Sequence, residues 1–470
     1  MKPVLLDPHP VSHTRLKNSP TLIRSLGLGD ATMLVVGCII GVGIFRTASS
    51  IATHLQNPWL ILGLWLFGGL LSLCGALCYA ELAALFPKSG GDYVYISKIY
   101  GRFWGFLFGW TKLFIERTGT IAILGVVFAE YLARILPQGP ATLRGVATAA
   151  IVGLTAVNVA GVRWGKYVQN IFTSFKVVAL VLLIGTGFWT LATHPIVSTP
   201  WMSPAMNLSV VPSMGMALIF VLWTYGGWTE AAYVAEEVKQ PTRNVPIAIV
   251  GGVLFCTLLY VMVNASYLLL IPIERLPETP LVAASLMQQV FGETGSTLIV
   301  GLIACSAFGA LNGYILTGAR ILYALGKDHT LFSRLGKIHP SFHTPERALW
   351  TNAAIAICLV WTKTFDQIMT YSTVVISIFF VLCVFGVIRL RHSQPSAPRP
   401  YKAWGYPLSP ILFCLTLIGF IIDVCLKEPK ECLFGFGLLV PGFFLYRYSE
   451  RMRSTLQPAA THEVRSESII

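Results

Sequence analysis

The chain has 470 residues, of which 55% are hydrophobic and only 12% are charged. Soluble globular domains carry about 25% charged residues, so this composition excludes a soluble domain and is typical of a membrane protein. The net charge of +13 comes from basic residues spread over separate segments, which gives no support to a nucleic-acid-binding protein.

Twelve apolar runs predict transmembrane helices, because a helix needs about 20 residues to cross the hydrocarbon core of a bilayer. The predicted fold class is therefore an all-α membrane protein with twelve transmembrane helices. The predicted spans cover residues 29–52, 59–85, 103–135, 143–161, 167–192, 213–237, 246–270, 296–325, 348–363, 367–390, 406–426 and 431–447.

The distribution of Lys and Arg predicts the orientation of these spans. An even number of spans places the tails 1–28 and 448–470 on the same side of the membrane. Most of the 34 Lys and Arg residues lie in these tails and in the loops on their side. The loops on the other side hold only Arg134, Arg144, Arg275, Lys363, Lys427 and Lys430. Because cytoplasmic segments carry the excess of basic residues, both tails are predicted to be cytoplasmic.

The first span contains the stretch "GCIIGVGIF", which runs from Gly37 to Phe45. Glycine is a poor helix former, and a helix break inside a membrane is tolerated only where it is buried in protein or lines a cavity. A half-helix that begins at the break would direct its free amides at an anion. The alternative is that Gly37 and Gly41 only allow a neighbouring helix to approach closely.

The sixth span contains "FVLWTYGGWTEAAYVAEE", with Gly226 and Gly227 near its middle. Two glycine-interrupted helices that stand five helices apart indicate an inverted-repeat transporter with its binding site at the two breaks. The predicted organisation is a first five-helix repeat (29–192), a second, inverted five-helix repeat (213–390) and two peripheral helices (406–447).

The two breaks predict what the site binds. Amides after Gly41 suit a carboxylate, and carbonyls released before Gly226 suit an ammonium group. A site that offers both suits a zwitterionic amino acid. Neither break has an acidic or basic residue beside it, so the ligand's side chain is predicted to be neutral. Glu230 is the nearest acidic residue, about one turn beyond Gly226. It could instead face the vestibule.

Some ionisable residues fall inside predicted spans. Lys112 and Glu116 are four residues apart and are predicted to pair, with Glu116 as a proton site being the alternative. Lys176 lies well inside the fifth span, where it either reaches back to the cytoplasmic interface or has a functional role. Arg320 is predicted to anchor at the inner interface. On the following loop, a solvated cluster is predicted at His329, His339 and His343.

Several stretches resemble the amino acid–polyamine–organocation superfamily, and within it the L-type amino-acid transporters. This resemblance implies the LeuT fold, a five-plus-five inverted repeat with broken helices 1 and 6 and two peripheral helices. The stretches are "GCIIGVGIF", "YAELAALFPKSGGDYVYI" (79–96), "NIFTSFKVVAL" (170–180), "WTYGGW" (223–228) with "EEVKQPTRNVP" (236–246), and "FGALNGYILTGARILYALGKD" (308–328).

The resemblance also implies substrate-binding positions in the two unwound segments, with Trp223 as an aromatic gate. The family often has Ser where this chain has Val42, so a hydroxyl contact to the substrate carboxylate is lost here while the backbone amide remains. The implied substrate-binding residues are Ile39, Gly41, Val42 and Gly43 in the first helix and Trp223, Thr224, Tyr225 and Gly226 in the sixth.

Lys176 corresponds in the resemblance to a lysine between the first and eighth helices, where sodium-coupled relatives bind an ion. A fixed ammonium group there implies sodium-independent transport, and a coupling proton carried by Lys176 is the alternative. Eukaryotic members bond a glycoprotein heavy chain through a Cys in the outer loop after the third span. The loop 136–145 has no Cys, which implies a stand-alone, bacterial member without a disulfide-linked heavy chain.

The expected function is transport of neutral amino acids across the bacterial inner (plasma) membrane by alternating access, as sodium-independent amino-acid exchange. The alternatives are a proton-coupled amino-acid symporter and an amino-acid sensor that does not transport. The expected partners are a small-molecule amino-acid substrate and membrane lipid. We expect no enzyme activity, no cofactor and no metal, because the sequence contains no catalytic constellation or metal-binding spacing.

Overall fold

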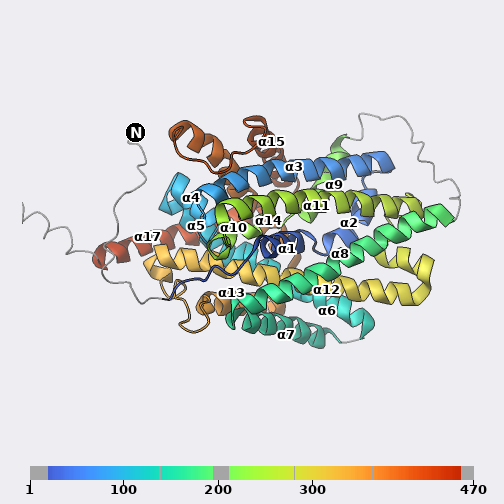
Figure 1. The fold of residues 1–470 in the computed structure, drawn as a ribbon, viewed down its shortest axis with the longest axis horizontal. Helices are drawn as coiled ribbons and strands as arrows, with labels where there is room; N and C mark the ends of the chain where they lie inside the picture. Colours follow the sequence, from blue (N-terminus) through green and yellow to red (C-terminus); the bar gives the residue numbers. More distant parts are fainter. Residues whose placement is uncertain (1–19, 137–138, 194–210, 280, 363–364, 457–470) are drawn as a thin grey trace, which may run out of the picture.

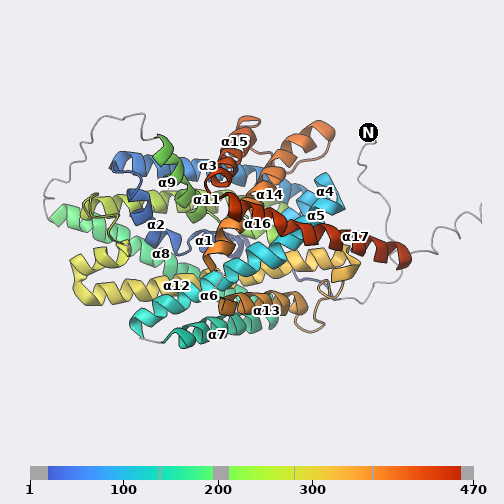
Figure 2. The same cartoon turned by 180° about the vertical axis from the view of Figure 1, so that it is seen from behind.

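The computed structural model describes residues 20–136, 139–193, 211–279, 281–362 and 365–456. Within these ranges the chain is helical, and the only strand-like contact is an isolated bridge between Leu26 and Val238. Ten helices are long and apolar enough to cross a membrane. The long helices run side by side along the long axis of the molecule (Figures 1 and 2). The predicted all-α, multi-pass membrane protein is confirmed.

Helices form at each of the twelve predicted spans. Ten of these meet the length and hydropathy of a membrane span, whereas the sixth contributes the shorter apolar stretch Ser213–Thr224 and the ninth is the 17-residue helix α13. The predicted first repeat (29–192) corresponds to α1 (Leu28–Ile39), α2 (Gly43–Ala52), α3 (Pro58–Leu85), α4 (Asp92–Tyr100), α5 (Arg102–Thr111), α6 (Arg117–Ile135), α7 (Pro140–Val159) and α8 (Val162–Thr193).

The predicted second repeat (213–390) corresponds to the next six helices. It contains α9 (Val211–Thr224), α10 (Glu230–Tyr233), α11 (Pro241–Leu270), α12 (Val282–Asp328), α13 (Glu346–Thr362) and α14 (Phe365–Ser393). The peripheral helices are α15 (Leu408–Lys427), α16 (Pro429–Gly437) and α17 (Leu439–Leu456).

Both predicted helix breaks are present. The first helix ends at Ile39 and resumes at Gly43, so residues 40–42 are not helical. The sixth helix ends at Thr224 and resumes at Glu230.

Two features of the eighth and third helices were not predicted. α12 has 47 residues and begins before the predicted start at 296, because a helical segment precedes Gly292 and joins it at a kink. Gly292 has a φ of 64°, which glycine adopts without strain. Between α5 and α6, residues Lys112–Glu116 form a π-helical turn. Such turns are frequent at functional sites.

The first break lies between two groups of packed helices. α3 packs against α11, and α11 also packs against α1. On the other side, α6, α7, α12 and α13 pack against one another. α8 contacts both α1 and α12. The first break is therefore enclosed by α8, α11 and α12, which supply the groups that meet it.

The segments predicted to be cytoplasmic meet at one end of the molecule, where α4, α5 and α17 lie in Figure 1. Their contacts connect parts of the chain that are far apart in sequence, so the basic loops share one end, as the predicted topology requires. The contacts join Leu26 to Val238, Asp30 to Lys166, Arg102 to Glu450, and Glu81 to Arg391.

Candidate functional site

The last carbonyls of α1 are held by protein donors. The Tyr260 hydroxyl of α11 donates to the Ile39 carbonyl at 2.8 Å and also lies 3.3 Å from the Thr224 carbonyl in the sixth helix. The Ser306 hydroxyl of α12 lies 3.4 Å from the carbonyls of Ile40 and Gly41. A helix end leaves such carbonyls without intrahelical partners, and here side chains of two other helices supply them.

The amides that follow the break have no such partners. Among the described residues, the backbone N–H groups of Val42, Gly43 and Ile44 have no hydrogen-bond acceptor, whereas the amide of Phe45 donates to the Val42 carbonyl at 3.2 Å. Three consecutive free amides at the start of α2 form an arrangement that binds anions. At the first break, therefore, the carbonyls have hydrogen-bond donors, whereas the amides have no acceptor among the described residues.

At the second break, the free backbone groups are carbonyls and not amides. The Gly226 amide turns back to the Trp223 carbonyl at 3.1 Å. Among the described residues, no donor reaches the carbonyls of Tyr225 and Gly226. These free carbonyls are suited to a cationic group, as free amides are to an anionic one.

Gly227 brings the two breaks into contact. Its φ is 102°, and a Cβ atom there would lie 2.6 Å from the Cys38 carbonyl oxygen in α1. Only glycine fits this conformation and this close approach of two backbones. The sixth helix therefore crosses the first near its break, so the free amides and the free carbonyls lie on neighbouring segments.

The glycines of the first break differ in their surroundings. A Cβ atom on Gly43 would lie 2.9 Å from the Thr224 hydroxyl and 3.1 Å from the Trp223 ring. A Cβ atom on Gly41 would meet nothing within 4 Å. Gly43 is therefore needed for packing between the first and sixth helices, whereas Gly41 borders open space.

The predicted side chains of the sixth helix point in different directions. Trp223 is 41% exposed and borders Gly43. The Thr224 hydroxyl is occupied by the Phe220 carbonyl at 2.7 Å. The Tyr225 side chain is fully buried and donates to the Trp65 carbonyl of α3 at 3.0 Å. Tyr225 therefore offers only its backbone to the break.

Lys176 is fully buried in α8 and donates from its ammonium group to the Gly37 carbonyl of α1. A Cβ atom on Gly309 of α12 would lie 3.1 Å from its Cε atom. The side chain thus lies between the first and eighth helices. The alternative that it reaches back to the interface is wrong, because its terminal group is enclosed by protein and hydrogen-bonded to the helix that breaks.

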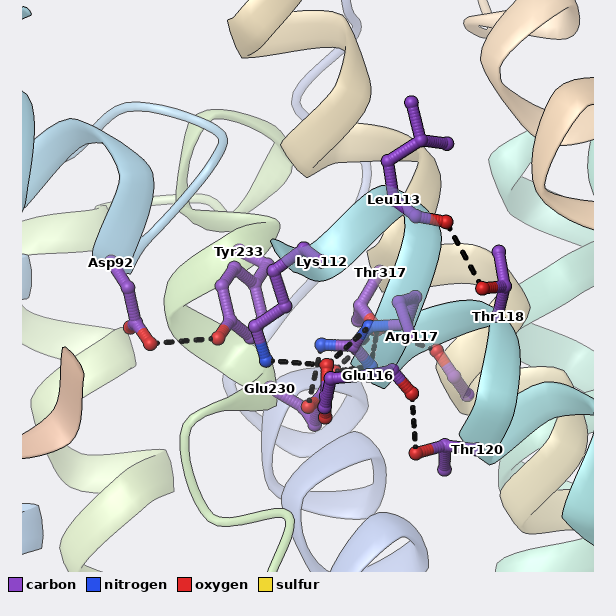
Figure 3. Close-up of polar contacts among 11 residues, drawn as sticks. Asp92, Lys112, Leu113, Glu116, Arg117, Thr118, Thr120, Glu230, Tyr233 and Thr317 are labelled. Carbon is purple, nitrogen blue, oxygen red and sulfur yellow. Dashed lines mark hydrogen bonds and ion pairs between the residues drawn. The ribbon is translucent and has the colours of Figure 1, made fainter. Parts of the chain in front are cut away.

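A buried cluster of charges lies beside the second break (Figure 3). Arg117 donates to both oxygens of Glu230, at 3.0 and 3.1 Å, and Thr317 of α12 also donates to Glu230. Glu230 is 2% exposed, so the alternative that it faces an open vestibule is wrong. The predicted pair of Lys112 with Glu116 is confirmed, with the two groups 2.7 Å apart.

Two other predictions for charged residues are wrong. Arg320 does not anchor at an interface: it is fully buried and donates to both carboxylate oxygens of Glu237, at 2.7 and 3.0 Å. His329 is not solvated, because it is 1% exposed and packs against the rings of Phe106 and Tyr446. In both cases the loop or helix end folds back into the protein, which the local sequence does not reveal.

Residues 26–426 match the amino acid permease family. The chain belongs to this family. The permease is 32% identical to the "Serine/threonine exchanger SteT" of Bacillus subtilis (strain 168) over 425 residues, which cover 89% of the permease and 94% of that protein. It is 30% identical to the human "b(0,+)-type amino acid transporter 1", with 91% and 88% of the two chains covered.

A third relative is the human "Large neutral amino acids transporter small subunit 2", which is 30% identical over 90% of the permease and 80% of that protein. These relatives and the family match confirm the predicted superfamily, that of the amino acid–polyamine–organocation transporters. The permease is a multi-pass membrane protein, and amino-acid transport is the activity that its family membership supports.

Proposed function

We propose that the permease exchanges neutral amino acids across the bacterial inner membrane by alternating access, without sodium. The observation that carries this proposal is the pairing of free amides at Val42, Gly43 and Ile44 with free carbonyls at Tyr225 and Gly226. The amides fit an α-carboxylate and the carbonyls fit an α-ammonium group. An α-amino acid carries both groups on one carbon atom, so it can bridge the two breaks.

A neutral side chain is favoured by the charges that surround the breaks. The ionisable group closest in sequence to the second break is Glu230, and Arg117 already pairs with both of its oxygens. A charged substrate side chain at the second break would therefore find no free partner in Glu230, and its desolvation would be costly. We assign Trp223 as the gate, because its exposed indole borders Gly43 at the point where the two broken helices meet.

The position of Lys176 supports the proposed independence from sodium. Its ammonium group donates to the Gly37 carbonyl and lies between α1 and α12. A fixed cation that already holds this carbonyl leaves no need for a bound sodium ion there. The loop 136–145 contains no Cys, so we propose that the permease works without a disulfide-linked heavy chain. We also propose that both termini lie in the cytoplasm.

The test is uptake of a labelled neutral amino acid by purified permease in liposomes. Serine and threonine are the first substrates to try, because one relative is named as their exchanger. We expect uptake only when the liposomes contain unlabelled amino acid, with the same rate in sodium and in potassium salts. Uptake into empty liposomes driven by a pH gradient would instead show proton symport. Binding without any uptake would show a sensor.

A further inference from the structure

In the part of the chain that the structure describes, one carboxyl group of the buried cluster forms no ion pair. Figure 3 shows Asp92, at the start of α4, next to Tyr233 of α10. The Tyr233 hydroxyl donates to Asp92 Oδ2 at 2.9 Å, while the buried Oδ1 atom has no hydrogen-bond partner among the described residues. Ionising a carboxyl group whose second oxygen is buried without a partner costs the free energy of desolvating that oxygen. Asp92 itself is fully buried.

The charges nearby are already matched in pairs. Lys112 lies 2.7 Å from Glu116, and Arg117 binds both oxygens of Glu230. Two cations and two carboxylates thus balance within the cluster, and an ionised Asp92 would add an unmatched negative charge. A proton on Asp92 makes the whole cluster neutral, which a buried site favours.

The contact between Asp92 and Tyr233 joins α4, which is held in place, to α10, which must move during alternating access. Tyr233 lies on the inner half of the broken sixth helix. Its carbonyl accepts from the Gly90 amide at 3.0 Å, and a Cβ atom on Gly91 would lie 2.6 Å from its ring. The turn before α4 therefore docks on α10 through backbone, ring and carboxyl contacts together. α4 packs against α5, α12 and α14, outside the broken helices.

We propose that Asp92 is a proton-binding site, protonated while α10 is docked and deprotonated when α10 moves away, so that pH sets the rate of amino-acid exchange. This proposal rests on the proposed function, because alternating access requires the inner half-helix to move. Undocking removes the Tyr233 hydroxyl and exposes the carboxyl to water. The proton is then released to water, and the carboxylate takes it up again on docking.

The titratable groups around Asp92 act in both directions: Lys112, Tyr233 and Tyr79 favour its ionised form, whereas Glu230 disfavours it. The groups around Asp92 are Tyr79 of α3, Tyr95 of α4, Lys112 of the π-helical turn, Glu230 and Tyr233 of α10, and Cys383 of α14. Asp92 lies outside the membrane-spanning helices, and its burial raises its pKa from 3.8 to about 6. The attraction of Lys112 and the start of α4 both favour the ionised form, but burial has the larger effect.

The expected size of the effect follows from proton linkage. With a pKa of about 6 when docked and 3.8 when hydrated, the docked state gains about tenfold in population between about pH 7.5 and about pH 5. Exchange requires undocking, so its rate should fall about tenfold over this range. A neutral amino acid keeps its zwitterionic form over most of this range, so its own ionisation contributes little.

The experiment measures exchange in liposomes at equal internal and external pH, from about pH 5 to about pH 7.5. Asp92→Asn should exchange at a slow rate that does not depend on pH. Tyr233→Phe should shift the midpoint of the profile to higher pH, because it removes the donor that favours the ionised carboxyl. Asp328→Asn is the matched control, since Asp328 also accepts from a tyrosine hydroxyl but is exposed. It should keep the wild-type profile.

Infrared spectroscopy tests, independently of transport, whether Asp92 is the group that binds the proton. A protonated-carboxyl band that grows between pH 7.5 and pH 5 should be present in the wild type and in Asp328→Asn, and absent in Asp92→Asn. A flat exchange profile in the wild type, or an unchanged band in Asp92→Asn, overturns the proposal. If the wild type shows the band but no exchange, the proton site stands and the proposed transport function fails.

Discussion

At the scale of single residues, Lys176 places a charge in the core with no acidic partner among the described residues. Its ammonium group holds the Gly37 carbonyl, one turn before the helix breaks. A buried cation in this position fixes the end of α1 relative to α8 and α12. Lys176 therefore holds in place the element that we propose to form part of the substrate site.

We expect Lys176→Ala to abolish exchange while the protein still folds and inserts. The substitution leaves the Gly37 carbonyl unpaired, which costs about 1–3 kcal/mol, and removes the link between α8 and the broken helix. The measurement is exchange in liposomes, with size-exclusion chromatography to confirm folding. Lys427→Ala is the control, because Lys427 forms an exposed pair with Asp423. Near-normal exchange by Lys176→Ala would contradict the role assigned to it.

At the scale of elements, the first break has one glycine that packs and one that borders open space. Gly43→Val would drive a side chain into Thr224 and Trp223, so its loss of function would not separate binding from packing. Gly41 has free space beside its Cα atom and lies directly before the free amides. Gly41 is therefore the position at which the binding role of the break can be tested.

We expect Gly41→Val to lose amino-acid binding by tenfold or more, about 1.4 kcal/mol or above, with folding intact. The β-branched side chain restricts the backbone of the break and fills the space beside the amides. The measurement is equilibrium binding of a labelled neutral amino acid. Gly153→Val in α7 is the matched control, since a Cβ atom there also meets nothing within 4 Å. If Gly41→Val binds the amino acid with wild-type affinity, the glycines of the first break serve helix packing and not substrate binding.

The two breaks could be predicted because glycine in an apolar run is a local signal. The partners of the buried charges could not be predicted, because they depend on which helices lie side by side. Lys112 and Glu116 were predicted to pair since they share one helix face, whereas Arg117 and Glu230 are brought together only by packing of the third and sixth helices. The start of α12 was missed for another reason: the residues around Gly292 are too polar to resemble a membrane span.

At the scale of the whole molecule, the proposed substrate joins two helices that belong to different parts of the chain. A ligand that contacts both breaks adds to the stability of the folded protein, because the unfolded chain cannot bind it. The stabilisation reports on the complete site, and it does not depend on transport.

We expect a neutral amino acid to raise the midpoint of thermal unfolding of the detergent-purified permease. At a concentration about 100 times its Kd the ligand should stabilise the protein by about 2.7 kcal/mol. The methyl ester of the same amino acid lacks the carboxylate that the free amides require, so it should give no shift. Equal stabilisation by acid and ester would mean that the start of α2 does not bind the carboxylate.

The hydroxyl of Tyr260 has a consequence for the empty transporter. It lies within reach of two carbonyls, those of Ile39 and Thr224, yet a hydroxyl has a single hydrogen to donate. The hydroxyl can therefore donate fully to only one of these oxygens at a time. The substrate ammonium group, which we propose to bind at the nearby carbonyls of Tyr225 and Gly226, would bring three further hydrogens to this crossing. Among the described residues, the crossing of the broken helices thus has more carbonyl oxygens than donors, and the proposed substrate would supply the missing hydrogens.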